Sequence, residues 1–160
     1  MKRKLGTLRR KTRRNRNKNK TRKSKRINMK GGVDYSKTIL NLSKKGLTEL
    51  PADLLKYTNL QILNCSNNKL EVLPELPASL EILYCFENKL EELPELPASL
   101  QELYCEKNQL TKLPELPASL QELECSNNPL KNVGFKITIK NREKYNQWLE
   151  DRQMENPVFK

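Results

Sequence analysis

Residues 80–99 read LEILYCFENKLEELPELPAS, and this 20-residue pattern decides how the chain folds. The stretches that begin at Leu60 and Leu100 carry the same framework of leucines, cysteine, asparagine and prolines. A shortened copy starts at Leu120, and an upstream copy starts at Lys37, with leucine in place of cysteine and three extra residues. Self-similarity at a short fixed period indicates a solenoid, in which each unit packs on its neighbours. The sequence therefore predicts an array of five units.

Each unit contains a short stretch in which apolar and polar positions alternate, as they do in a β-strand. In the quoted unit, Leu83 and Cys85 fall on one face. Ile82, Tyr84 and Phe86 fall on the opposite face. One strand per unit gives a parallel sheet, so we expect an α/β-type solenoid that is mostly β, with this sheet on its concave face.

The turn after each strand has a recurring polar residue. An asparagine follows each cysteine by three positions, at Asn68, Asn88, Asn108 and Asn128. A buried amide at this place can satisfy turn backbone groups that water no longer reaches. Lys45 breaks the series in the first unit. The prolines of each LPELP stretch keep the preceding residues out of the α region, which predicts an extended or polyproline-like convex side without a helix.

The cysteines allow four interpretations: nucleophile, metal ligand, disulfide and core packing. They recur every 20 residues, at Cys65, Cys85, Cys105 and Cys125. Equivalent positions on neighbouring parallel strands lie roughly 4.8 Å apart, which makes a straight row about 14 Å long. One zinc ion needs its sulfurs within roughly 3.8 Å of one another, so the row does not suit zinc. Parallel side chains at this spacing also exceed the usual disulfide geometry. Packing as small apolar residues fits best.

Charge divides the chain into three parts. By count, residues 1–36 carry a net charge of +15, residues 37–134 carry −5 and residues 135–160 carry +2. We assign the first part to a disordered basic tail, the second to the solenoid and the third to a C-terminal cap. The like charges and few apolar residues of the tail predict disorder.

The basic tail has three candidate roles: nuclear or nucleolar targeting, nonspecific contact with nucleic acid or another polyanion, and no specific role. No aromatic residue is interleaved to stack on bases, so sequence-specific recognition is not expected. The candidate residues are Lys2, Arg3, Lys4, Arg9, Arg10, Lys11, Arg13, Arg14, Arg16, Arg22, Lys23, Lys25 and Arg26.

The two ends of a solenoid expose apolar groups that caps must cover. Residues 135–139 alternate like one more strand, and Tyr145, Trp148 and Leu149 then follow at helical spacing. We expect a strand-helix cap here, with a partner-binding helix as the alternative. At the other end, residues 33–38 offer little for the same purpose.

Catalytic chemistry has few candidates. The chain contains no histidine, which excludes Ser-His-Asp and Cys-His arrangements, and its five glycines form no phosphate-binding motif. We therefore expect no enzyme, no cofactor and no metal. No apolar run is typical of a secretory signal or long enough to span a membrane. We expect an intracellular protein, in the cytoplasm, the nucleus or both, with the nucleolus or a host cell as further options.

The frame LPELPASL followed by LxxLxCxxNxL resembles the bacterial-type leucine-rich repeat, known from secreted bacterial effectors. A basic tail, strand cysteines and a short array also resemble leucine-rich repeat proteins predicted in giant DNA viruses. The resemblance implies a curved scaffold that binds a protein on its concave sheet. Some of those effectors add a ubiquitin-ligase domain and an N-terminal helical hairpin. These 160 residues contain neither, and ubiquitin transfer is not expected.

Outward strand positions form the candidate binding face. Tyr84 and Tyr104 occupy equivalent places, with Phe86 beside them, and glutamates surround them. Clustered aromatics suit an interface hot spot, while packing along the sheet is the alternative. The glutamates favour a basic or amphipathic partner. The candidate residues are Ile62, Asn64, Ile82, Tyr84, Phe86, Glu102, Tyr104, Glu106 and Glu124.

Two functions follow from these features. The first is an intracellular protein-interaction scaffold, expected to be a monomer, whose concave face binds a protein while the tail localises it. The second is a nucleic-acid-associated protein in which the tail is the main binding element and the repeats are a passive body. Removal of residues 1–32 distinguishes them, because only the second function is lost with the tail.

Overall fold

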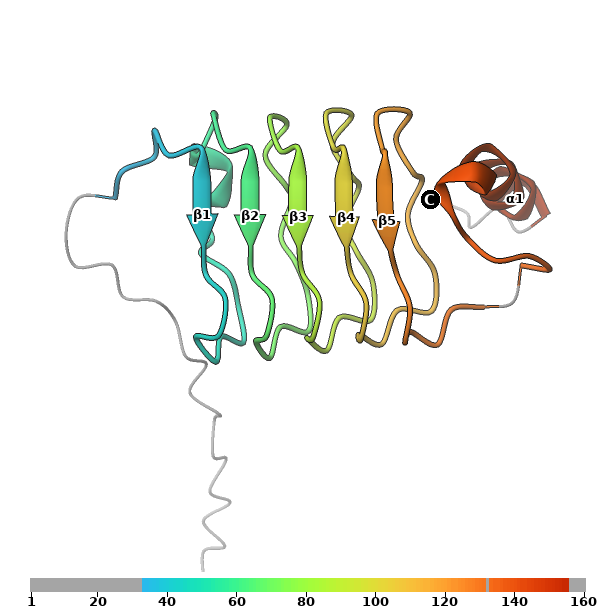
Figure 1. Ribbon diagram of the computed structural model, residues 1–160, viewed down its shortest axis with the longest axis horizontal. Coiled ribbons are helices and arrows are strands. Elements are labelled where there is room, and N and C mark those ends of the chain that lie inside the picture. Colours follow the sequence, from blue (N-terminus) through green and yellow to red (C-terminus); the bar gives the residue numbers. More distant parts are fainter. Residues whose placement is uncertain (1–32, 132, 156–160) are drawn as a thin grey trace, which may run out of the picture.

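The computed structural model describes residues 33–131 and 133–155 (Figure 1). Most of the predicted basic tail, residues 1–32, lies outside this range. The elements follow in the order β1 (Ile39–Asn41), η1 (Leu54–Lys56), β2 (Ile62–Asn64), β3 (Ile82–Tyr84), β4 (Glu102–Tyr104), β5 (Glu122–Glu124), η2 (Ile139–Asn141) and α1 (Arg142–Glu155), where η marks a 3-10 helix.

The five strands form one parallel sheet in the order β1-β2-β3-β4-β5. The central leucine of each strand is aligned with that of its neighbour; Leu63 pairs with Leu83, and Leu83 pairs with Leu103. One strand per repeat, stacked in sequence order, is the parallel solenoid that the 20-residue period predicts (Figure 1). The fold prediction is confirmed.

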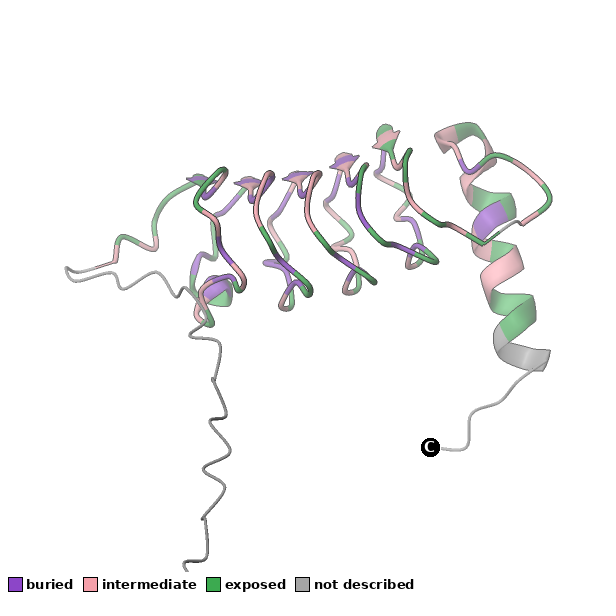
Figure 2. Ribbon diagram, turned by 90° about the horizontal axis from the view of Figure 1, so that it is seen from below, coloured by how far each residue is buried: buried purple, intermediate pink, exposed green. Residues whose placement is uncertain are grey.

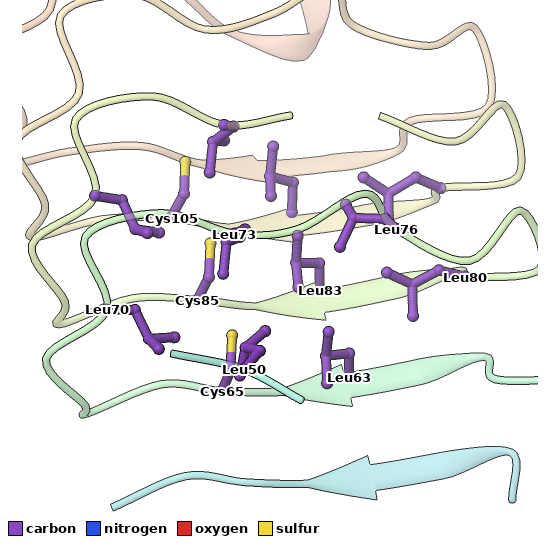
Figure 3. Close-up of a cluster of buried hydrophobic side chains, with 14 of the residues drawn as sticks. Leu50, Leu63, Cys65, Leu70, Leu73, Leu76, Leu80, Leu83, Cys85 and Cys105 are labelled. Atoms are coloured by element: carbon purple, nitrogen blue, oxygen red, sulfur yellow. The ribbon is translucent and has the colours of Figure 1, made fainter. Parts of the chain in front are cut away.

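Several stacked rows of leucines and one row of cysteines fill the space between the sheet and the return segments. Leu63, Leu83 and Leu103 are fully buried. Figure 3 shows the sulfur atoms of Cys65 and Cys85 beside the leucines contributed by the return segments, which they contact as apolar groups. Each unit lies on its neighbours with this layer continuous through the array.

The convex side differs between the first unit and those that follow. The stretches with two prolines, at 73–79, 93–99 and 113–119, contain no helix, as predicted. The first unit has Pro51 alone and three extra residues, and there the chain forms η1. Without a second proline, the residues after Pro51 adopt helical angles, and Leu54 enters the core.

Each strand ends in a turn that needs a left-handed backbone conformation. The residue before the recurring asparagine, or before Lys45 in the first unit, has φ between 54° and 56°, at Lys44, Asn67, Glu87, Lys107 and Asn127. Glycine and asparagine tolerate this region best, whereas lysine and glutamate adopt it at an energetic cost. The repeat pattern of the sequence does not predict this conformation.

The asparagine that follows closes the turn and joins neighbouring units. The Asn108 side chain donates to the carbonyls of Cys105, in its own turn, and Cys85, in the unit before, both at 3.1 Å. Its oxygen accepts the backbone N–H of Leu90 at 3.1 Å. Lys45 supplies no such amide in the first unit; its own N–H donates to Asn68 instead. The amide series thus satisfies turn groups across the interfaces between units.

The N-terminal end is better covered than the sequence suggested. Tyr35 packs edge-on against Tyr57, with ring centroids 5.0 Å apart, and its hydroxyl donates to Asp53. Val33 also packs against the core. The expectation that residues 33–38 offer little for a cap is therefore wrong. Tyr35 contacts the buried ring of Tyr57, the residue that follows η1.

The C-terminal cap contains a helix but no strand. Residues 135–138 lack strand structure, which corrects the predicted strand-helix cap. Gly134 has φ +81° and turns the chain out of the sheet's path, and Ile137 packs into the core without pairing with β5. Figure 2, which looks along the strands, shows α1 at the end of the array, extending toward its convex side.

Helix α1 holds the last return segment through polar side chains. The Tyr145 hydroxyl accepts from the Leu113 N–H at 2.9 Å and donates to the Leu113 carbonyl at 2.7 Å. Asn146 makes the same double contact with Leu116, at 3.0 and 2.8 Å. These bonds replace those that a further unit would supply.

Candidate partner-binding face

The register of the sheet arranges the outward side chains in three rows across the strands. From β1 to β5, the rows are Ile39, Ile62, Ile82, Glu102 and Glu122; Asn41, Asn64, Tyr84, Tyr104 and Glu124; and Ser43, Ser66, Phe86, Glu106 and Ser126. We call these fifteen positions the concave face. Its composition changes along the array, from isoleucine and amide groups, through aromatics, to carboxylates.

The N-terminal half of the concave face is apolar in its first row. Ile39 is 58% exposed, and Ile62 and Ile82 are half-buried. Asn64 is partly committed within the protein, because its side-chain oxygen accepts the N–H of Ser66 at 3.1 Å and the hydroxyl at 2.7 Å. The isoleucines are therefore the main free contact groups at this end.

The two tyrosines lie at the boundary between the apolar and acidic halves. Tyr84 and Tyr104 stack with ring centroids 4.9 Å apart and an interplanar angle of 16°. The Tyr104 hydroxyl donates to Glu122 and, at 3.3 Å, to Glu102. These bonds stabilise the protonated hydroxyl, so Glu122 above all raises the pKa of Tyr104. The aromatic pair is therefore held in one orientation, and its packing along the sheet does not bury it.

The C-terminal half of the concave face is acidic. Glu106 is half-buried, its Oε2 atom has no hydrogen-bond partner among the described residues, and burial raises the pKa of its carboxyl. At the edge of this half, Lys107 pairs with Glu87 at 2.6 Å. The Ser126 side chain and N–H lower the pKa of Glu124, whose oxygen accepts that N–H at 3.0 Å.

The structure brings the nine predicted face residues onto one surface. Glu122, the strand equivalent of Glu102, lies on the same surface but is not among the nine. The repeat frame held the signal for this residue, because the same position one unit earlier was already included. The hydrogen bond from Tyr104 is a side-chain contact that the frame does not specify.

The cysteines lie on the opposite side of the strands, in the core. Cys65, Cys85 and Cys105 are fully buried, and burial raises the pKa of Cys65 to about 12. Cys125 is half-buried, which differs from the expected row of four equivalent thiols. In the part of the chain that the structure describes, no further unit follows β5 to cover it. Among the described residues, no group of three histidine, cysteine, aspartate or glutamate side chains could hold a metal ion.

The predicted tail site, from Lys2 to Arg26, lies outside the described residues. Across residues 33–131 and 133–155, no helix is both long and apolar enough to cross a membrane.

Comparison with known proteins bears on the repeats. Residues 59–80 match the family model described as Leucine Rich Repeat. A leucine-rich repeat domain of a Shigella effector is 41% identical, with a TM-score of 0.57 over 59% of this chain. The array is a leucine-rich repeat domain. Its 20-residue units are of the bacterial type, as the resemblance implied.

The leucine-rich repeat domain covers only part of its relatives. The match spans 42% of the Shigella chain. YopM from Yersinia enterocolitica is 34% identical, with a TM-score of 0.47, over 60% of this chain and 26% of that one. Leucine-rich repeat domains are generally protein-protein interaction scaffolds.

Proposed function

We propose that the protein is a non-enzymatic interaction scaffold whose concave face binds a protein segment that is apolar at one end and basic at the other. The observation that carries the proposal is the change in composition across the strand register. The first row passes from Ile62 and Ile82 to Glu102 and Glu122 in four successive strands.

The stacked tyrosines supply the centre of this interface. Aromatic side chains held rigidly lose little entropy on binding and are enriched among residues that dominate binding energy. Tyr84 and Tyr104 are aromatic and are held in place, since their rings stack at 4.9 Å and Tyr104 is hydrogen-bonded to two glutamates. An apolar side chain of the partner would contact Ile82 and the Tyr84 ring.

The acidic half favours a cation next to that apolar side chain. Strands lie roughly 4.8 Å apart, so about 10 Å separates Ile82 from Glu122 along the row. An arginine or lysine three residues from the apolar anchor in a polyproline II segment spans this length, at about 3.1 Å per residue. Its side chain points to the same side as the anchor, because this conformation has three residues per turn. The orphaned Oε2 of Glu106 offers a further acceptor, and a partner's cation there would lower the pKa of this carboxyl.

The test is quantitative affinity purification from cell extract with residues 33–160 as bait. Tyr84→Ala combined with Tyr104→Ala, and separately Glu102→Lys, should each lose the proteins retained by the unaltered bait. Glu75→Lys is the matched control, because Glu75 is an exposed glutamate of the same repeat frame outside the sheet. Retention that falls equally in Glu75→Lys and Glu102→Lys would contradict binding on the concave face.

We propose a separate role for the basic segment: localisation within a cell, in the cytoplasm or nucleus, or contact with a polyanion. The support is the net charge of +15 over residues 1–36, counted from the sequence. Phosphate contacts release counterions, so binding of the full chain to RNA should weaken steeply with salt, and residues 33–160 should not bind. Equal RNA binding by both proteins would refute a role for this segment.

A further inference from the structure

The outer edge of β5 keeps the hydrogen-bonding groups that every other strand uses to join the next unit. The N–H groups of Cys65, Cys85 and Cys105 donate to the following strand at 2.9, 2.9 and 2.8 Å. Two residues further on, Asn67, Glu87 and Lys107 do the same at 3.0, 3.1 and 3.0 Å. In the last unit, no described residue accepts the N–H of Cys125 or Asn127.

The cap covers the convex half of this end and leaves the strand half open. In earlier units, the hydroxyls of Ser79, Ser99 and Ser119 donate to the carbonyl of the leucine that begins the same unit, one turn of the solenoid earlier. After the last unit, Arg142 takes over this task and donates to the carbonyls of Ala118 and Leu120, at 2.8 and 3.3 Å. Helix α1 thus completes the return segment, whereas β5 pairs with no described strand on its outer side.

A groove of about 350 Å³ follows the open edge. One wall is formed by Leu123 and Cys125 of the last unit, and the other by Phe135 and Ile137 of the segment that leads to η2. Leu123 and Cys125 are half-buried, whereas the equivalent Leu103 and Cys105 are fully buried. The edge therefore presents both unpaired backbone donors and unfilled apolar contacts.

The asparagine series defines what would fit the groove. The N–H groups of Leu70, Leu90 and Leu110 each donate to the asparagine of the next unit at 3.1 Å. No described residue accepts the corresponding N–H of Leu130. A ligand that completes this end needs an extended backbone whose carbonyls accept the N–H groups of Cys125 and Asn127. It also needs an asparagine three residues after its last inward-facing side chain.

We propose that the open edge of β5 binds an extended segment of a partner protein as a sixth parallel strand. The segment carries apolar side chains at two alternating positions, which fill the groove, and an asparagine three residues later, which accepts the Leu130 N–H. Strand addition of this kind obtains affinity from backbone hydrogen bonds and specificity from alternate side chains. This site lies beside the proposed partner-binding face and is independent of it.

A second copy of the chain is a poor occupant. Its exposed first strand is followed by Lys45 at the position where the groove requires asparagine. It would also bring Lys44 and Lys45 toward Lys131 and Lys136, which line the groove, and like charges repel. The two lysines favour a segment with an acidic residue between or beside its apolar positions.

The test uses the full chain and a synthetic peptide with the sequence of residues 100–111, LQELYCEKNQLT, under reducing conditions. This peptide has the required apolar alternation, asparagine and acidic residues. Amide hydrogen exchange is followed by NMR. In the free protein, Cys125 and Asn127 should exchange at least about tenfold faster than Cys105 and Lys107, because their N–H groups lack acceptors.

Saturating peptide should slow exchange at Cys125, Asn127 and Leu130 by about tenfold or more. A peptide with Asn108→Ala should bind about fivefold more weakly, since one hydrogen bond is lost. If the peptide changes the chemical shifts of Tyr84 and Tyr104 alone, the strand-addition proposal is overturned and the concave-face proposal is unaffected. Slow amide exchange of Cys125 and Asn127 in the free protein would also overturn the strand-addition proposal. If that slow exchange depends on protein concentration, it results from self-association; if it does not, the chain's own residues protect these groups.

Discussion

The side chain of Asn88 donates to the backbone carbonyl of Cys65, in the preceding unit, at 3.1 Å. Its oxygen accepts the N–H of Leu70, also in that unit, at 3.1 Å. Each asparagine therefore ties its own turn to the previous one, while leucines and cysteines provide the buried area. Polar and apolar contacts across the same interface explain why such short strands stack in one register.

Removal of this amide should weaken the array. Asn88→Ala leaves turn groups unsatisfied and should lower the free energy of unfolding by roughly 1–3 kcal/mol. Leu83→Ala creates a cavity and should cost about 2–5 kcal/mol. Denaturant unfolding measures both changes. Glu95→Ala, at an exposed position of the same unit, is the control and should change stability by less than about 0.5 kcal/mol. Equal midpoints for the three variants would contradict the repeat geometry.

The left-handed turn residue offers a stabilising substitution. Lys44 has φ 55° and is exposed, whereas Asn67 and Asn127 occupy the same position in other units. Asparagine tolerates this region better than lysine, so Lys44→Asn should raise the free energy of unfolding by about 0.5 kcal/mol. Lys37→Asn, at an exposed position without a left-handed backbone, should not reproduce the gain. A lower melting temperature for Lys44→Asn would count against the turn conformation.

The thiols should react in two classes. Cys125 is half-buried, whereas Cys65, Cys85 and Cys105 are fully buried. A thiol reagent should modify one cysteine of the native protein quickly and three only as it unfolds. The substitution Cys125→Ser should remove the fast reaction and leave the slow one. Four equal slow reactions would show that other residues cover the end of the array.

Buried thiols also predict a loss of stability in alkali. Burial raises the pKa of Cys85 and Cys105 well above the ordinary value of 9.0, and that of Cys65 to about 12. Their contribution is complete below pH 9.0 and is lost as pH rises toward the native pKa, since unfolded thiols ionise first. Stability should fall by roughly 1 kcal/mol per pH unit for each thiol above about pH 9.

The matched variant for this pH dependence is Cys85→Val, which keeps an apolar side chain without a thiol. Its stability should decline less steeply between pH 9 and pH 11 than that of the unaltered protein, measured by denaturant unfolding at each pH. Parallel curves for the two proteins would show that the Cys85 thiol has the same pKa in the folded and unfolded states.

The period of the sequence was sufficient to predict the repeats, the strands and the concave rows. The alternation of apolar and polar positions around Leu83 recurs in every unit, so a wrong strand assignment in one unit would have disagreed with the other units. The turn conformation escaped prediction, because Glu87 and Lys107 are residue types that give no sign of positive φ. Local sequence patterns predict the backbone conformation only where the φ and ψ angles are common for the residue types present.

The ends of the array were harder to predict than its middle, because they lack a second copy for comparison. Residues 135–139 alternate like a strand, but Gly134 redirects the chain and Ile137 packs into the core instead. Tyr35 was overlooked because its contact with Tyr57 depends on η1, which occurs only in the first unit. In both cases tertiary contacts override the local pattern.

Selection of phage-displayed random peptides by residues 33–160 measures directly what the concave face recognises. The enriched peptides should carry lysine or arginine about three residues from an apolar residue. These peptides should lose affinity for Tyr84→Ala with Tyr104→Ala and for Glu102→Lys but keep it for Glu75→Lys. Enrichment of acidic peptides, or equal binding to all three variants, would contradict a concave face that recognises basic and apolar partners.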